Sequence, residues 1–426
     1  MAQSAVETAL SSGLRARVWP RRNRTAIVAR LYFHRSLELA EAAAVALIPR
    51  VLKRGTAQCP GQRLLARALA HLYGAGFGAD VAKVGERQVV VFGLDVPDPA
   101  RIGEGREYLT KVLKLWSGLI LDPALQDGSL RQDWVDSERD FLARQINALR
   151  NDKLALARQR CLEAMFPGRA YAVHRLGRLQ DLQGVDAGRL TRAYREMVGG
   201  WPAELHVSGP VEPGLFLELL DSTLRLYPGQ SPPLQQPLSA TAGAGDGRDS
   251  DDVQQAKLVM GGLTGINPGR AQWAALLFYN GILGGFAHSK LFRNVREAAG
   301  LAYYARSVLH STAGVLLIEA GIDSCRQEQA TALIGEQLED MRRGRISREE
   351  MDSTRESLFS VRRMLEDDAH GVLDHGFEGS RCGFAPDLDR ELSALNAVTV
   401  EAVTAVARQV EMVTRYALCP LGEGEA

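Results

Sequence analysis

The sequence has few cysteines, no excess of either charge and no long apolar run. Its five cysteines are scattered and include no Cys-x-x-Cys pair, which argues against a zinc ribbon or a thiol-exchange site. Lysine plus arginine number 51 and aspartate plus glutamate 51, so no basic field would gather nucleic acid or an anionic membrane. The sequence contains no run of about eighteen apolar residues, the length that a membrane span requires. Its N-terminus also lacks the apolar core of a secretory signal. We therefore expect a cytoplasmic protein with reduced thiols and with no nucleic-acid or membrane partner.

One stretch, from Pro228 to Asp252, is rich in proline, glycine, serine and aspartate and almost free of large apolar residues. Such a composition is typical of a linker between domains. At 426 residues, the chain is also too long for one core, because domains usually have roughly 100 to 200 residues. The sequence predicts two domains, residues 1–228 and 253–426, joined by a linker at 229–252.

Similar segments occur in the same order on both sides of this linker. Each half has an apolar helical run, then a β-branched strand, and at its end a helix followed by a last strand. The runs and strands begin at Leu39, Arg87 and Ala203 in the first half and at Ala271, Gly314 and Arg415 in the second. In the second half, Ser347 and Glu350 form a capping-box pattern that predicts a helix to about Leu365. Strands mixed with long helices, without regular βαβ alternation, predict an α+β domain used twice.

The most specific motif is NGILGGFAHSKLFRNVREAAGLAYYARSV, from Asn280 to Val308. It combines a Leu-Gly-Gly turn, a Ser-Lys-Leu-Phe helix and an Arg-Glu-x-x-Gly-Leu-Ala-Tyr run. This order resembles the second-half signature of the M16 peptidases, the family of pitrilysin, insulinase and mitochondrial processing peptidase. The resemblance extends from about Ile27 to Leu421. It implies two homologous M16 domains, each an antiparallel-rich sheet packed with helices.

Arg296 and Tyr303 are the arginine and the tyrosine of the last run. In catalytic members this pair reaches the substrate backbone at the scissile bond, where a guanidinium and a phenol can hydrogen-bond the carbonyl and its developing oxyanion. The resemblance therefore implies that Arg296 and Tyr303 bind substrate. The alternative is that Arg296 is an ordinary surface residue of a helix and Tyr303 a core aromatic.

The first half lacks the family's metal motif. Catalytic members carry His-x-x-Glu-His on a helix, where the histidines bind zinc and the glutamate activates the zinc-bound water. Alignment of LKRGT (52–56) with the family's Leu-Phe-Lys-Gly-Thr places Ala46 and Arg50 at the histidines and Pro49 at the glutamate. Alanine has no ligand atom, arginine is a permanent cation, and proline removes a helical N–H and favours a kink. We expect no metal and no other cofactor.

Glu138, in WVDSERDFLARQ, stands by resemblance at the family's third zinc ligand, although its distance in sequence from Arg50 is longer than usual. One carboxylate cannot hold zinc alone, so we expect a vestigial glutamate that is solvated or paired with a cation. His370 and Asp374 form a second candidate metal pair at i, i+4. Nearby aspartates and a glycine favour a helix end or surface turn there.

The segment from Tyr73 to Val96 resembles the family's strand and hairpin after the metal helix. In the family, a peptide adds to the exposed edge as an extra strand, held by backbone hydrogen bonds. The resemblance implies a substrate edge at Gly78, Ala79, Asp80 and Val81, and the alternative is an ordinary meander of strands. The sequences LYGA and DVAKVGE in this segment most resemble those of bacterial zinc-less members associated with the 5-aminopentanol modification of elongation factor P.

Loss of the zinc ligands with retention of Arg296 and Tyr303 matches one role in paired M16 proteins, in which one chain supplies zinc and the other contacts the substrate. The resemblance implies a non-catalytic, substrate-binding subunit that pairs with a zinc-bearing M16 homologue and receives a peptide or protein. A homodimer is the other assembly that the resemblance allows. Two alternatives stay open, because a fold alone does not give a function: a structural or assembly protein, and a peptide-binding chaperone without a peptidase role.

Overall fold

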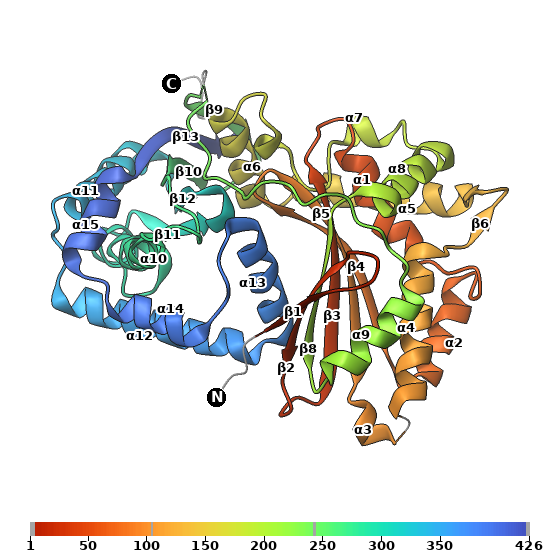
Figure 1. Cartoon of the computed structure of the whole chain (residues 1–426). Helices are drawn as coiled ribbons and strands as arrows, with labels where there is room; N and C mark the ends of the chain where they lie inside the picture. The colour runs from red at the N-terminus through yellow and green to blue at the C-terminus, as the bar shows by residue number, and fades with distance from the viewer. Residues whose placement is uncertain (1–4, 104, 242–243, 423–426) are drawn as a thin grey trace. The chain divides into compact units, whose positions relative to one another are not determined.

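The computed structural model describes residues 5–103, 105–241 and 244–422, which divide between two compact units (Figure 1). The first unit comprises Met1–Asn147, Val173–Pro233 and Asp368–Phe377, and the second comprises Ala148–Ala172, Leu234–Asp367 and Glu378–Ala426. Each unit contains one large sheet with helices packed on it, which confirms the predicted α+β class. No helix in the described ranges has the length and apolar character that crossing a membrane requires.

A six-stranded sheet forms the centre of the first unit, in the order β1-β2-β8-β3-β5-β4. Its strands are β1 (Val6–Ala9), β2 (Arg15–Pro20), β8 (Ala203–Gly209), β3 (Ala26–Ser36), β5 (Arg87–Pro97) and β4 (Gly76–Val84). Strands β2 and β8 are parallel, and the other neighbours are antiparallel. The order leaves β4 at one edge of the sheet, with β5 as its neighbour.

The helices of the first unit are α1 (Ala42–Leu52), α2 (Gln62–His71), α3 (Pro99–Ile102), α4 (Gly105–Leu121), α5 (Gln132–Leu149), α7 (Leu179–Leu182), α8 (Ala187–Gly200) and α9 (Pro213–Thr223). A small hairpin, β6 (Leu125–Gln126) and β7 (Ser129–Leu130), precedes α5. Helix α1 packs on β4, β5 and α8, and all its residues except Arg50 are buried. It continues through Pro49 to Leu52, so the proline does not end the helix. Burial of the helix offsets the missing proline N–H.

The five-stranded sheet of the second unit has the order β11-β12-β10-β13-β9. Its strands are β11 (Ala302–His310), β12 (Val315–Ile322), β10 (Ala256–Leu263), β13 (Glu411–Pro420) and β9 (Gly247–Asp251). Read in reverse, this order repeats β2-β8-β3-β5-β4 strand for strand, including the parallel pair at the same place. The repeated topology is the structural form of the predicted duplication.

Strand β9 lies inside the segment 229–252 that the composition predicts to be a linker. It pairs with β13, and polar contacts anchor it: Arg415 binds Asp246 at 2.8 Å, and the Tyr416 hydroxyl donates to Asp249 at 2.5 Å. Because these anchors are aspartates, the strand has the composition of a loop. The equivalence with β2 makes β9 the first strand of the repeated sheet.

The second unit contains α6 (Lys153–Met165), α10 (Trp273–Asn280), α11 (Gln327–Arg342), α12 (Arg348–Asp367), α14 (Leu388–Asn396) and α15 (Val400–Gln409), and α13 (Ala369–Cys382) begins in the first unit. Two π-helical segments, η2 (Gly281–Gly285) and η3 (Leu291–Ala298), follow α10. Short 3-10 turns are η1 (Ala170–Ala172), η4 (Ser311–Ala313) and η5 (Ser324–Arg326). Helix α6 comes from the N-terminal half of the sequence but packs on β10 and β13, where Cys161 and Met165 join a core with Val259 and Leu317.

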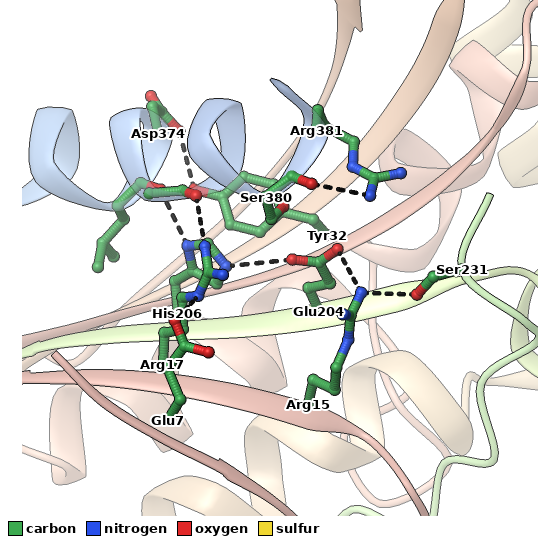
Figure 2. A network of polar contacts seen from close by, with 12 residues as sticks. Glu7, Arg15, Arg17, Tyr32, Glu204, His206, Ser231, Asp374, Ser380 and Arg381 are labelled. Carbon is green, nitrogen blue, oxygen red and sulfur yellow. Dashed lines mark hydrogen bonds and ion pairs between the residues drawn. The ribbon is translucent and has the colours of Figure 1, made fainter. Parts of the chain in front are cut away.

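The opening part of α13 makes the reverse exchange and lies in the first unit (Figure 2). The Tyr32 hydroxyl on β3 donates to Asp374 at 2.8 Å, and the Tyr32 ring stacks on Phe377 at 4.3 Å. The ring nitrogen Nδ1 of His206 on β8 lies 3.1 Å from the Leu373 carbonyl. Burial and the Asp374 carboxylate raise the pKa of the Tyr32 phenol, so Tyr32 stays a donor. The compact units thus differ from the contiguous ranges 1–228 and 253–426 by two exchanged segments.

Candidate functional site

The positions expected to bind zinc lie on α1 and α5 of the first unit. Ala46 is fully buried in the core and presents only a methyl group. Arg50 reaches α5, where its guanidinium donates to the Gln145 side chain and lies over the Phe141 ring, 5.4 Å from the ring centroid. A cation therefore occupies the position of the second expected histidine, and its partners are an amide and an aromatic ring.

Glu138 lies on α5 and is engaged by an arginine. Arg54 Nη1 is 3.2 Å from Glu138 Oε1, and the two side chains are only 22% and 17% exposed. Arg54 follows Arg50 by four residues, so both arginines reach α5 from successive turns. A cation partner for Glu138 was one of the two expectations from the sequence, but Arg54 was not named as that partner, although the spacing Arg50-x-x-x-Arg54 contained the signal. Within residues 5–103, 105–241 and 244–422, no three His, Cys, Asp or Glu side chains are grouped so that they could hold a metal ion.

The second candidate metal pair is also engaged in other contacts. His370 Nε2 lies 3.3 Å from Asp95 on β5, whereas Asp374 accepts the hydroxyl of Tyr32 on β3. The two residues share a side of α13, as their spacing predicts, and both are exposed, whereas Val372, Leu373 and Phe377 are the buried residues that pack on the sheet. The composition favours a helix end or a surface turn, and a helix end is present, because α12 ends at Asp367; a second helix, α13, then begins at Ala369 and docks on the sheet.

The predicted substrate edge, Gly78 to Val81, lies on β4 at the edge of the sheet. Gly78 and Asp80 are exposed, whereas Ala79 and Val81 are buried, as alternation along a strand requires. The N–H of Val81 donates to Asp80 Oδ1 at 2.8 Å, and its carbonyl accepts from Arg175 Nη1 at 2.6 Å. Arg175 is a further residue at this edge that sequence reasoning did not identify.

Tyr303 lies on β11, at an edge of the second sheet. The register of β11 with β12 shifts between Ala302 and Tyr304, so Tyr303 is the extra residue of a bulge. The residue is 73% exposed, which contradicts the alternative of a core aromatic. Bulges re-aim side chains at sheet edges.

Arg296 lies near the end of η3, on an exposed position. Its guanidinium lies over the Phe292 ring, with the guanidinium carbon 4.5 Å from the ring centroid, so a cation–π contact helps to orient the side chain. Gly300, between η3 and β11, has φ +61° with no atom within 4 Å of an added Cβ, so backbone conformation requires glycine there. Arg296 and Tyr303 belong to one continuous η3–β11 segment, and no described contact joins their side chains.

A buried ion cluster holds β11 in its sheet. Glu319 on β12 is 0% exposed and accepts from Arg306 on β11 at 2.8 Å and from Arg158 on α6 at 2.6 Å. Burial alone would raise the pKa of Glu319, but the hydrogen bonds and charges of the two arginines hold that pKa below its ordinary value. The cluster ties α6 to the strand that carries Tyr303.

Sequence comparisons relate this chain to a family of peptidases. The profile described as Peptidase M16 inactive domain matches residues 184–358. The chain is 30% identical to the probable inactive metalloprotease YmfF of Bacillus subtilis, over 88% of each chain. It is 31% identical to the uncharacterized zinc protease YmxG of the same organism, over 37% of this chain and 39% of that one.

Among solved structures, the fold is similar to that of a conserved protein from Enterococcus faecalis V583, with a TM-score of 0.91 and 24% identity over 99% of this chain and 100% of that one. The relationship to YmfF spans nearly the whole chain, and Ala46 and Arg50 stand at the positions where the family's zinc-binding histidines are expected. The chain therefore belongs to the M16 peptidase family, as a non-catalytic member.

Proposed function

We propose that this chain is the substrate-binding subunit of a heteromeric M16 zinc peptidase, paired with a zinc-bearing homologue that performs the chemistry. The observation that carries the proposal is the place of Tyr303, a residue 73% exposed to solvent at a bulge of an edge strand. An aromatic residue held out of the core contributes little to stability through burial. Exposure alone does not require a ligand, since Tyr227 is also 68% exposed. Tyr303 differs because it lies at a bulge, which re-aims side chains at sheet edges, and because it is the motif tyrosine that contacts substrate in catalytic members of the family.

The chemistry of the pair fits a peptide ligand. The Tyr303 hydroxyl and the Arg296 guanidinium are donors, and a peptide carbonyl that becomes an oxyanion during hydrolysis is the acceptor that gains most from them. Both donors are exposed on the η3–β11 segment of the second unit. They need a metal-bound water from another chain, because Ala46, Pro49 and Arg50 supply neither ligands nor a general base.

The comparisons make a pair of chains plausible in one cell. Bacillus subtilis has both YmfF, a probable inactive metalloprotease, and YmxG, an uncharacterized zinc protease. A cell that holds a probable inactive metalloprotease and a zinc protease, both similar to this chain, supports the proposed pairing. The partner of the present chain would be a homologue with intact His-x-x-Glu-His.

The test is reconstitution with such a homologue from the same cell. We expect hydrolysis of a quenched fluorescent peptide to rise well above the sum of the separate rates and to saturate at one chain of each kind. A zinc chelator should abolish this rate, because the metal belongs to the partner. Rates that stay additive at all concentrations would disprove the peptidase pair. A stable complex without a rate gain would instead support an assembly role.

A further inference from the structure

The free edge of β4 presents backbone groups at alternate residues. The β4–β5 hairpin closes at the pair Val84 and Arg87, with a two-residue turn at 85–86. The two residues of such a closing pair hydrogen-bond each other. From this pair on, successive residues of the strand therefore direct their N–H and C=O groups alternately away from β5 and toward it. Counting back from Val84, the residues that direct N–H and C=O away from β5 are Lys83, Val81, Ala79 and Phe77.

The outward groups of Val81 are already occupied. Its N–H donates to Asp80 Oδ1 at 2.8 Å, and its C=O accepts from Arg175 Nη1 at 2.6 Å. Arg175 Nη1 also lies 3.8 Å from Asp80 Oδ2, so the two side chains pair beside the middle of the strand. For Phe77 and Ala79, the described part of the chain supplies no hydrogen bond to these groups.

Arg175 is held in place by a segment that runs beside β4. Gln88, which is buried, donates to the Arg175 carbonyl at 2.7 Å. Lys83 Nζ donates to the Val173 carbonyl at 3.3 Å. Gly177 has φ +72° and passes so close to Ala43 that an added Cβ would lie 2.4 Å from the Ala43 nitrogen. The Arg175 side chain therefore extends from a backbone that is fixed on both sides.

We propose that Asp80 and Arg175 form a latch on the β4 edge, which an extended peptide must open before it can pair beyond Ala79. The latch rests on the proposed substrate-binding function and sets how much of the edge a peptide can use. A peptide in β conformation pairs with Phe77 and Ala79 while the latch is closed. To continue along the strand, its own N–H and C=O must replace Asp80 and Arg175 at Val81.

This competition predicts tighter peptide binding when the latch is removed. Arg175→Ala frees the Val81 carbonyl and Asp80→Ala frees the Val81 N–H, so the peptide no longer displaces an internal partner. One net hydrogen bond corresponds to a change in Kd of about two- to tenfold. Both side chains are largely exposed, 44% for Arg175 and 69% for Asp80, so the variants should keep their fold.

The matched control is Arg195→Ala. Arg195 Nη2 donates to the Gly128 carbonyl at 2.7 Å, so it makes the same kind of contact in the same unit but away from β4. The probe is a fluorescein-labelled decapeptide of alternating valine and threonine, measured by fluorescence polarisation. Two further versions carry N-methyl groups on odd or on even residues. Because only one set of N–H groups faces β4, one version should lose binding and the other should keep it.

Hydrogen exchange of residues 76–84 reports the latch directly. We expect faster exchange of the Val81 amide in Asp80→Ala, and renewed protection when the decapeptide is added. The proposal is overturned if both latch variants bind the decapeptide within about 1.5-fold of the unchanged chain, or if no variant binds it at all. The first result leaves the edge site standing and the second removes it. Pairing with the zinc-bearing homologue is measured in the separate peptidase assay. A failure to pair can therefore be distinguished from either of these two binding results.

Discussion

Arg54 Nη1 lies 3.2 Å from Glu138 Oε1, and both side chains are largely shielded from solvent. Glu138 is the residue that stands, by family resemblance, at the third zinc ligand. Its charge is balanced here by a permanent cation from the turn that follows α1. The ion pair joins α5 to the turn that follows α1.

Purified chain should contain no stoichiometric zinc and should hydrolyse no peptide alone. Ala46 and Arg50 supply no ligands, and Pro49 supplies no base. Elemental analysis after dialysis against zinc checks the first point, and a quenched peptide assay checks the second. About one zinc per chain, lost in Glu138→Gln, would show that the carboxylate still binds metal.

Glu138→Gln should destabilise the first unit by about 1 to 2 kcal/mol, because Arg54 then keeps its charge without a counter-ion in a shielded place. Urea denaturation gives the difference. Glu218→Gln is the matched control: Glu218 pairs with Arg106 at 2.7 Å with both side chains more than half exposed, and it should change stability by less than about 0.5 kcal/mol. Equal effects of the two substitutions would remove the role given to the Arg54 pair.

Arg296→Ala and Tyr303→Phe should each lower kcat/KM of the reconstituted pair by about 10² to 10³, the usual loss when one oxyanion donor is removed. Both residues are exposed, so the melting temperature and the pairing should not change. Exposed Tyr227→Phe, on a residue 68% open to solvent in the first unit, is the matched control and should retain full activity. Activity within about threefold in both site variants would mean that the pair does not act on the substrate.

Glu319 should make the second unit sensitive to acid. Its folded-state pKa is lowered, so its contribution to stability is complete above the ordinary glutamate pKa of about 4.3 and is lost as pH falls through the lower folded value. Glu319→Gln should cost about 2 to 4 kcal/mol at neutral pH, since two arginines lose their shared partner. Chemical denaturation of both proteins from about pH 6 to about pH 3 should show this difference shrinking toward acid. A difference that does not change with pH would contradict it.

Gly177→Ala should destabilise the first unit by about 2 to 4 kcal/mol. The left-handed backbone costs about 1 kcal/mol for alanine, and the added Cβ would press on the Ala43 backbone. Gly13→Ala separates the two causes, because Gly13 has φ +83° but no atom within 4 Å of an added Cβ, and it should cost only about 1 kcal/mol. Thermal denaturation of the two variants side by side checks the difference.

Local chemistry made much of the fold predictable. The capping box is formed as predicted: the Ser347 N–H donates to Glu350 Oε2 at 2.8 Å, and the Glu350 N–H donates to Ser347 Oγ at 3.1 Å. The helix that it starts, α12, ends at Asp367, close to the predicted Leu365. The predicted strand AELHVSG is β8, Ala203–Gly209. Caps and alternating apolar residues are encoded by neighbours in sequence, so the sequence alone reveals them.

Long-range partners were not predictable in the same way. The apolar face of α6 indicates burial, but nothing in its periodicity says that the covering strands are β10 and β13. The exposure of Tyr303 depends on one bulge, and the neutralisation of Glu138 depends on where Arg54 falls after α1. The sequence alone could therefore identify residues of the candidate site. It could not predict the contacts that these residues make with partners far away in the sequence.

The exchange of α13 has a consequence for synthesis on the ribosome. The sheet of the first unit is complete once Pro233 has emerged, but its covering segment, Asp368–Phe377, comes roughly 130 residues later, on the order of ten seconds at usual rates of translation. Until then Trp19 and Val28 lack Val372 and Leu373, the residues that cover them in the finished chain. A nascent chain that stalls before Asp368 therefore displays an apolar strip, which makes the unfinished protein a substrate for chaperones and for quality-control proteases.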